Sequence, residues 1–133
     1  MNLSSAKRLN NGVAMPFVGL GVWLAKHDET VQAVKWALEA GYRHIDTAKI
    51  YQNEAAVGQG VRESGLPRDQ VFITTKLWND DMRTGRQMEA FEESLKALGT
   101  EYVDLYLLHW AVDDVYIPSW NVLEKRFFRV FRG

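Results

Sequence analysis

The hydrophobic pattern of the chain changes between two periods. Four short apolar segments, each bounded by turn-forming residues, are typical of buried strands: 17–23, 43–47, 71–78 and 102–110. Ahead of them, Asn11-Gly12 lies between two short alternating segments, and this dipeptide favours the tight turn of a β-hairpin. The pattern therefore predicts a small amino-terminal hairpin followed by four strands.

Each predicted strand is followed by a segment with helical periodicity. The clearest covers 86–98, where apolar residues recur at steps of three and four and Gly99 follows as a terminator. Asp28, Asn53 and Ser119 stand at the start of the other three segments, and such residues commonly cap helices. We therefore expect a helix to begin at or just after each of these three residues.

The order strand–helix, repeated four times, predicts an α/β fold with a parallel sheet and outer helices. Successive strands begin 26 to 31 residues apart, and eight such units would make about 250 residues, the size of a closed (β/α)8 TIM barrel. Four units are half of one barrel, and periodicity alone leaves an open flavodoxin-like sheet as the alternative. We expect one partial domain over residues 1–133, with a half-barrel at 1–125 and a divergent tail at 126–133.

The composition is that of a globular protein. Hydrophobic residues make up 47% of the chain, and 16 basic side chains nearly balance 17 acidic ones, so neither a nucleic acid nor an anionic membrane is an expected partner. The absence of cysteine excludes disulfides and thiolate metal sites, and the three histidines lack the spacing of metal ligands. Since no segment has the pattern of a signal peptide or a membrane helix, we expect a cytoplasmic protein.

Chemically useful side chains stand where the predicted strands end, and parallel β/α folds gather their reactive groups at that edge. Tyr51 follows the second strand, and the four strand ends carry Val22-Trp23, Asp46, Lys76-Leu77-Trp78 and His109-Trp110. Taken singly, each such residue is more often a cap, a surface residue or a packing residue. Taken together on one predicted edge, they indicate a site.

A general acid can be built from these groups. A lysine on a buried strand needs a counter-charge, and Asp46 on the neighbouring strand is the natural partner of Lys76. The ammonium group would stabilise the phenolate of Tyr51 and so make this residue a better acid. His109 would orient a substrate oxygen. Such a set suits protonation of a carbonyl oxygen while hydride reaches carbon, and a cofactor must supply that hydride.

Three tryptophans just past strand ends, Trp23, Trp78 and Trp110, would wall a small carbonyl substrate, although ordinary packing explains any one of them equally well. The segment GLGVWL begins as a dinucleotide fingerprint, but Leu24 stands where the third glycine belongs. Composition and pattern therefore indicate a carbonyl site without a glycine-rich nucleotide loop.

Four segments of the chain resemble the aldo-keto reductase family: NGVAMPFVGLGVW, GYRHIDTAKIYQNEAAVGQGVRESG, VFITTKLWN and VDLYLLHW. Within that family they are most similar to prostaglandin F synthase-like and 2,5-diketo-gluconate reductase-like members. The resemblance implies a (β/α)8 barrel that reduces aldehydes and ketones with NADPH. It also implies catalytic roles for Tyr51, Lys76, Asp46 and His109, substrate contacts from Trp23, Trp78, His109 and Trp110, and cofactor contacts from Val22, Trp23 and Asp46.

The resemblance has limits along the chain. Ala111 stands where the family usually has proline, and residues 126–133 do not resemble the turn and fifth strand that come after the fourth helix in that family. Most of the cofactor site is expected in the half of the barrel that these segments do not cover. Two interpretations stay open, an NADP(H)-dependent oxidoreductase or a truncated, non-catalytic remnant or interaction module. An open half-barrel exposes two sheet edges, so self-association is also expected.

Overall fold

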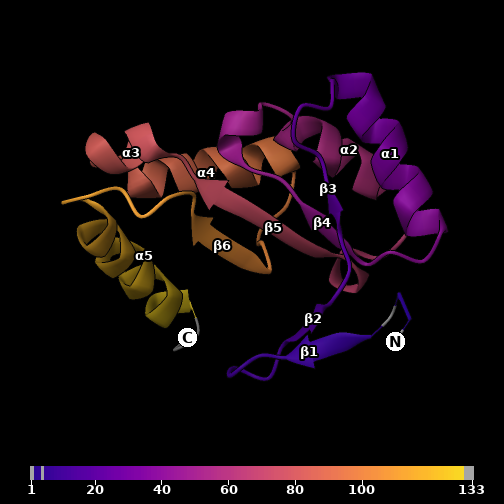
Figure 1. Cartoon of the computed structure of the whole chain (residues 1–133), viewed down its shortest axis with the longest axis horizontal. Helices are drawn as coiled ribbons and strands as arrows, with labels where there is room; N and C mark the ends of the chain where they lie inside the picture. The colour runs from indigo at the N-terminus through magenta and orange to yellow at the C-terminus, as the bar shows by residue number, and fades with distance from the viewer. Residues whose placement is uncertain (1, 4, 131–133) are drawn as a thin grey trace.

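The computed structural model describes residues 2–3 and 5–130, and of residues 127–130 it describes the backbone alone. An amino-terminal hairpin lies to one side of a sheet against which helices pack (Figure 1). Strands β1 (Ala6–Arg8) and β2 (Ala14–Pro16) pair antiparallel in this hairpin. Gly12 has a φ of +87° in its turn, which explains why glycine stands there and confirms the predicted hairpin.

The sheet contains four parallel strands whose order in space is their order in the chain. They are β3 (Leu20–Gly21), β4 (His44–Asp46), β5 (Phe72–Leu77) and β6 (Leu105–Leu108). The prediction of a parallel sheet is confirmed. The first strand is much shorter than the predicted 17–23, because only two residues pair and the apolar residues around them lie in connecting segments.

A helix follows each of these strands. The helices are α1 (His27–Glu39), α2 (Glu54–Glu63), α4 (Gln87–Leu98) and α5 (Tyr116–Val130), with a short α3 (Asn79–Arg83) after β5. Two single 3₁₀ turns, η1 (Lys49–Tyr51) and η2 (Arg68–Gln70), precede α2 and β5. The sequence pattern did not predict α3, because five residues are too few to show a helical period.

Two of the predicted helix caps are wrong. Asp28 lies inside the first turn of α1, where Glu29 accepts a hydrogen bond from the backbone N–H of Lys26 at 3.1 Å. Ser119 lies inside α5 and is fully buried, accepting a hydrogen bond from Gln87 at 3.0 Å. The helix begins three residues before Ser119, and Pro118 fits in its first turn because no N–H donor is needed there.

The two faces of the sheet differ in character because side chains alternate along each strand. One face packs against the helices through a cluster of buried residues: Val34, Leu38, Ile45, Val57, Val61, Ile73 and Leu98. A second cluster, around Leu77, Met82 and Ala90, continues this core beneath β6. His44, Asp46, Thr74 and Lys76 stand at the alternate positions, so the face without helices carries polar side chains.

The last helix crosses the predicted boundary between half-barrel and tail. Residues 126–130 continue α5, and residues 131–133 of the predicted tail lie outside the described residues. The division at 125–126 therefore stays a prediction. None of the helices in the described part of the chain combines the length and apolarity needed to cross a bilayer.

Candidate active site

Three predicted site residues meet at the carboxyl edge of the sheet. Asp46 ends β4, Lys76 lies next to last in β5, and His109 follows β6 with its backbone N–H bonded to the carbonyl of Leu77 at 3.0 Å. Neighbouring parallel strands end at the same edge, which is why residues 30 and 33 positions apart become neighbours. The structure thus gathers the strand-end residues onto one rim.

The ammonium group of Lys76 is held by two oxygens. Nζ lies 2.6 Å from Oδ1 of Asp46 and donates to the backbone carbonyl of Thr47 at 2.9 Å. The Lys76 side chain is 14% exposed and that of Asp46 36% exposed. A charge this poorly hydrated needs a partner, and the counter-charge expected from the sequence is the one observed.

Tyr51 stands beside this ammonium group. It is the last residue of η1, and Nζ of Lys76 lies 5.1 Å from the centroid of its ring. The turn ends at Gln52, whose left-handed φ of 57° sends the chain on toward α2. A cation at this distance from an aromatic ring is attracted to it, so the two side chains hold one another at the rim.

The imidazole of His109 packs between two aromatic rings. The edge-to-face centroid distances are 5.9 Å to Tyr51 and 5.1 Å to Trp78. Burial lowers the pKa of His109, the nearby Lys76 lowers it further, and Asp46 only partly opposes them. The imidazole is therefore neutral near pH 7. Its buried Nδ1 has no hydrogen-bond partner among the described residues.

The remaining predicted residues lie in different environments. Trp78 is partly buried against His109, whereas Trp23 and Trp110 are 69% and 65% exposed. The side chain of Val22 is 2% exposed and belongs to the core. A ligand contact at Val22 would therefore have to come through its backbone, while both exposed tryptophans have surface free for a ligand.

One buried residue ties the loops of this rim together and was not identified as part of the site from the sequence. Asn53 accepts a hydrogen bond from Thr47 at 2.9 Å and donates to the carbonyls of Val22 at 2.7 Å and Ala25 at 3.3 Å. The sequence indicated a helix cap, and Asn53 does precede α2, but its side chain makes no capping bond. The sequence pattern around Asn53 does not indicate contacts with these loops, so its role could not be predicted.

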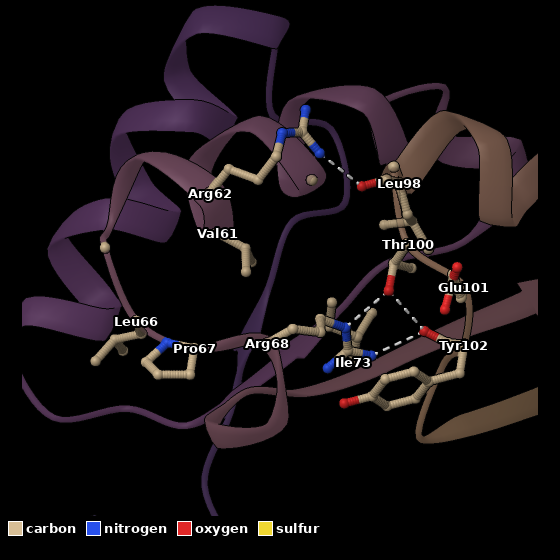
Figure 2. Close-up of a pocket in the computed structure, with 13 residues that line it drawn as sticks. Val61, Arg62, Leu66, Pro67, Arg68, Ile73, Leu98, Thr100, Glu101 and Tyr102 are labelled. Atoms are coloured by element: carbon tan, nitrogen blue, oxygen red, sulfur yellow. Dashed lines mark hydrogen bonds between the residues drawn. The ribbon is translucent and has the colours of Figure 1, made fainter.

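A hollow of about 620 Å³ lies at the opposite, amino end of the sheet, and none of the predicted site residues lines it (Figure 2). Arg68 dominates this region. It pairs with Asp104 at 2.8 Å, donates to Thr100 at 3.1 Å and stacks 4.2 Å above the ring centroid of Tyr102. Because these polar groups satisfy one another, this end of the sheet is built for stability rather than for chemistry.

Comparison with known proteins identifies the family of this chain. A model of the aldo/keto reductase family matches residues 18–126. The chain is 56% identical over 118 residues to the 9,11-endoperoxide prostaglandin H2 reductase of Trypanosoma cruzi, covering 88% of this chain and 42% of that protein. It is 47% identical over 125 residues to the glyoxal reductase of Bacillus subtilis, covering 93% and 45% respectively.

Solved structures show the same partial coverage. The aldo-keto reductase of Bombyx mori in complex with NADP superposes with a TM-score of 0.84 at 42% identity, over 91% of this chain and 46% of that one. The chain thus spans less than half the length of these relatives. The likeness excludes the open flavodoxin-like sheet, and the chain belongs to the aldo/keto reductase family as the amino-terminal half of a (β/α)8 barrel.

Proposed function

We propose that these residues form the proton-transferring half of an NADP(H)-dependent reductase that converts aldehydes and ketones to alcohols. The observation that carries the proposal is the position of Lys76, 2.6 Å from Asp46 and 5.1 Å from the ring of Tyr51. The names of relatives support it, since one is a glyoxal reductase and glyoxal is a small dicarbonyl compound.

The proposed reaction adds a hydride to the carbonyl carbon and a proton to its oxygen. The reduced nicotinamide cofactor, when bound, supplies the hydride. Tyr51 gives its phenolic proton to the carbonyl oxygen and is left as a phenolate. Lys76 stabilises that phenolate by its charge, and Asp46 holds the ammonium group in place. The neutral His109 donates an N–H to the same oxygen and orients it toward Tyr51.

The described residues fit the reacting end of such a cofactor better than its phosphate end. At the rim, a buried nitrogen of His109 has no hydrogen-bond partner in the described part of the chain, and Asp46 and Trp23 are accessible to a ligand. The loops that come after the strands, 22–26, 47–53 and 109–115, hold Lys26 and Lys49 as cations, and Lys49 is engaged with two carboxylates. We therefore assign the nicotinamide contacts to this rim and the phosphate contacts to groups outside the described residues.

The proposed substrate is a small carbonyl compound with apolar surface. Trp78 already packs edge-to-face on His109, and Trp23 and Trp110 expose most of their surface. Aromatic rings around a few polar groups are the usual lining of such sites. In this arrangement His109 marks the substrate oxygen, and the tryptophans contact the apolar remainder.

A non-catalytic role is the second candidate. Leu107 is 38% exposed on the sheet face without helices, and β3 and β6 are the outer strands of the described sheet. Unpaired strand edges and exposed apolar residues favour association with another chain. These observations support an interaction module, or a second copy of the chain bound at the open edges.

Oxidation of NADPH in the presence of a simple aldehyde separates the two candidates. The wild-type chain is compared with Tyr51→Phe, which keeps the ring and removes the acid proton. Aldehyde-dependent oxidation that is lost in Tyr51→Phe supports the reductase. If the folded wild-type chain shows no oxidation at saturating NADPH and aldehyde, the non-catalytic role is favoured instead.

A further inference from the structure

Four charged side chains behind the rim form a closed ring of alternating sign. Lys49 pairs with Asp81 at 2.9 Å and with Glu93 at 2.7 Å. Arg86 completes the ring, 2.7 Å from Glu93 and 3.6 Å from Asp81. Each cation touches both anions, so no member can move without loosening two contacts. We call this set the charge ring.

The charge ring joins segments that are far apart in the chain. Lys49 is the first residue of η1, Asp81 lies in α3, Arg86 precedes α4, and Glu93 lies in α4. Its two inner members are the least exposed, since the side chains of Lys49 and Asp81 are 24% and 9% exposed. The ring is therefore partly withdrawn from water, which strengthens its attractions compared with an ordinary surface ion pair.

The pKa shifts of Lys49 and Glu93 are those expected when both residues are held in the charge ring. Burial alone would lower the pKa of Lys49, but hydrogen bonds to Glu93 and Asp81 outweigh burial and raise it. The hydrogen bond from Lys49 and its charge in turn lower the pKa of Glu93. Both groups thus stay charged across the neutral range.

The position of Lys49 relative to Tyr51 gives the ring a functional meaning. The two residues are the ends of the same 3₁₀ turn, in which the N–H of Tyr51 donates to Ala48 at 3.0 Å and that of Gln52 to Lys49 at 3.1 Å. On the far side of Tyr51, Asn53 is fixed to the loops after β3 and β4. Tyr51 therefore stands between two anchors, one ionic and one made of hydrogen bonds.

We propose that Lys49 is a positioning residue for Tyr51: the charge ring anchors η1 to α3 and α4 and thereby sets the distance between the phenol and Lys76. The anchoring is independent of any reaction, whereas its catalytic consequence rests on the proposed function. The ring also reaches the opposite wall of the site, because Trp78, which contacts His109, directly precedes α3. One ionic contact set thus holds two parts of the rim in register.

The test compares two lysine substitutions that remove one charge each. Lys49→Met keeps most of the apolar stem and opens the ring. Lys35→Met is the matched control, since Lys35 pairs with Glu63 at 2.9 Å on the outer helices and touches neither η1 nor the ring. Amide hydrogen exchange of residues 49–52 and the nuclear Overhauser effect between the rings of Tyr51 and His109 are measured by NMR in the full chain.

In Lys49→Met, the amides of Tyr51 and Gln52 should exchange about tenfold faster, and the Tyr51–His109 effect should weaken. Amides in α1 and β5 should keep their rates, and Lys35→Met should leave residues 49–52 unchanged. If the wild-type chain reduces an aldehyde, Lys49→Met should lower kcat while KM stays the same. Lys49→Arg keeps the charge and should restore protection.

Unchanged exchange at residues 49–52 in Lys49→Met overturns the proposal. If that variant fails to fold, Glu93→Gln decides, because Glu93 is half exposed and its loss opens the same ring without emptying a buried position. Normal protection and an intact ring contact in Glu93→Gln would likewise refute the anchoring. A wild-type chain without reductase activity contradicts the proposed function alone, since the exchange and NMR readouts do not depend on turnover.

Discussion

Replacing Gly58 with alanine tests how closely α2 packs on the end of α4. A Cβ at this position would collide with the carbonyl oxygen of Leu98 and lie 2.6 Å from its carbonyl carbon. It would also lie 3.0 Å from Nη1 of Arg62, the atom that donates to the same carbonyl at 2.9 Å. Backbone atoms cannot rotate away as a side chain can, so the two helices must separate.

The size of the effect combines three contributions. Forcing an extra methyl group into a packed contact costs about 1–3 kcal/mol. Loss of the hydrogen bond from Arg62 to Leu98 adds about 1 kcal/mol. Alanine in place of glycine inside a helix returns about 1 kcal/mol. We therefore expect Gly58→Ala to lower the free energy of unfolding by about 2 kcal/mol.

Urea denaturation followed by circular dichroism measures this difference. With a slope of roughly 2 kcal/mol per molar urea for a chain of this size, the midpoint should fall by about 1 M. Gly21→Ala is the control, because a Cβ at Gly21 meets no atom within 4 Å, and its midpoint should move by less than half as much. A Gly58→Ala midpoint equal to or above that of wild type would refute the close packing of α2 on α4.

Three further measurements address charge and assembly. Burial lowers the pKa values of His44 and His109, so below about pH 6.5 the unfolded chain binds more protons at these two residues than the folded chain does. Between pH 7 and pH 5 the urea midpoint of the wild type should therefore fall relative to that of a variant with glutamine at both positions, and a difference between the two that does not change with pH would contradict this. Burial raises the pKa of Glu54, so its charged form destabilises the fold. Glu54→Gln should therefore raise the urea midpoint at pH 8, and this increase should shrink toward pH 4. An unchanged midpoint at pH 8 would argue against a destabilising buried charge. Sedimentation should show a concentration-dependent dimer formed at the open sheet edges, and a stable monomer at all concentrations would exclude it.

The sequence pattern predicted the sheet because burial imposes regular spacing. Strands around Ile45 and Ile73 and the helix ending at Leu98 place their apolar residues on one face, and these residues are fully or almost fully buried. The predictions were wrong where burial does not impose a regular spacing on the residues. Residues 17–19 are apolar without pairing in the sheet, and Asp28 and Ser119 look like caps but lie one or more positions inside their helices.

In the candidate site, too, some contacts could be predicted from the sequence and others could not. Asp46 and Lys76 could be paired from the sequence, since adjacent parallel strands bring their ends together and a charge on a buried strand needs a partner. The contacts that hold the segment around Tyr51 in place could not be predicted in this way. Lys49 finds Asp81 and Glu93 at separations of 32 and 44 residues, and the side chain of Asn53 reaches back 31 residues to Val22. Contacts over such separations leave no periodic pattern in the sequence from which they could be predicted.

The consecutive order of β3, β4, β5 and β6 also permits the rim to assemble in the order of synthesis. Each new strand can dock on the one made just before it, so no strand has to wait for a distant partner. Asp46 emerges first, Lys76 meets its counter-charge when β5 docks, and His109 closes the group when β6 is added. A growing chain would thus never bury the lysine before its aspartate is in place.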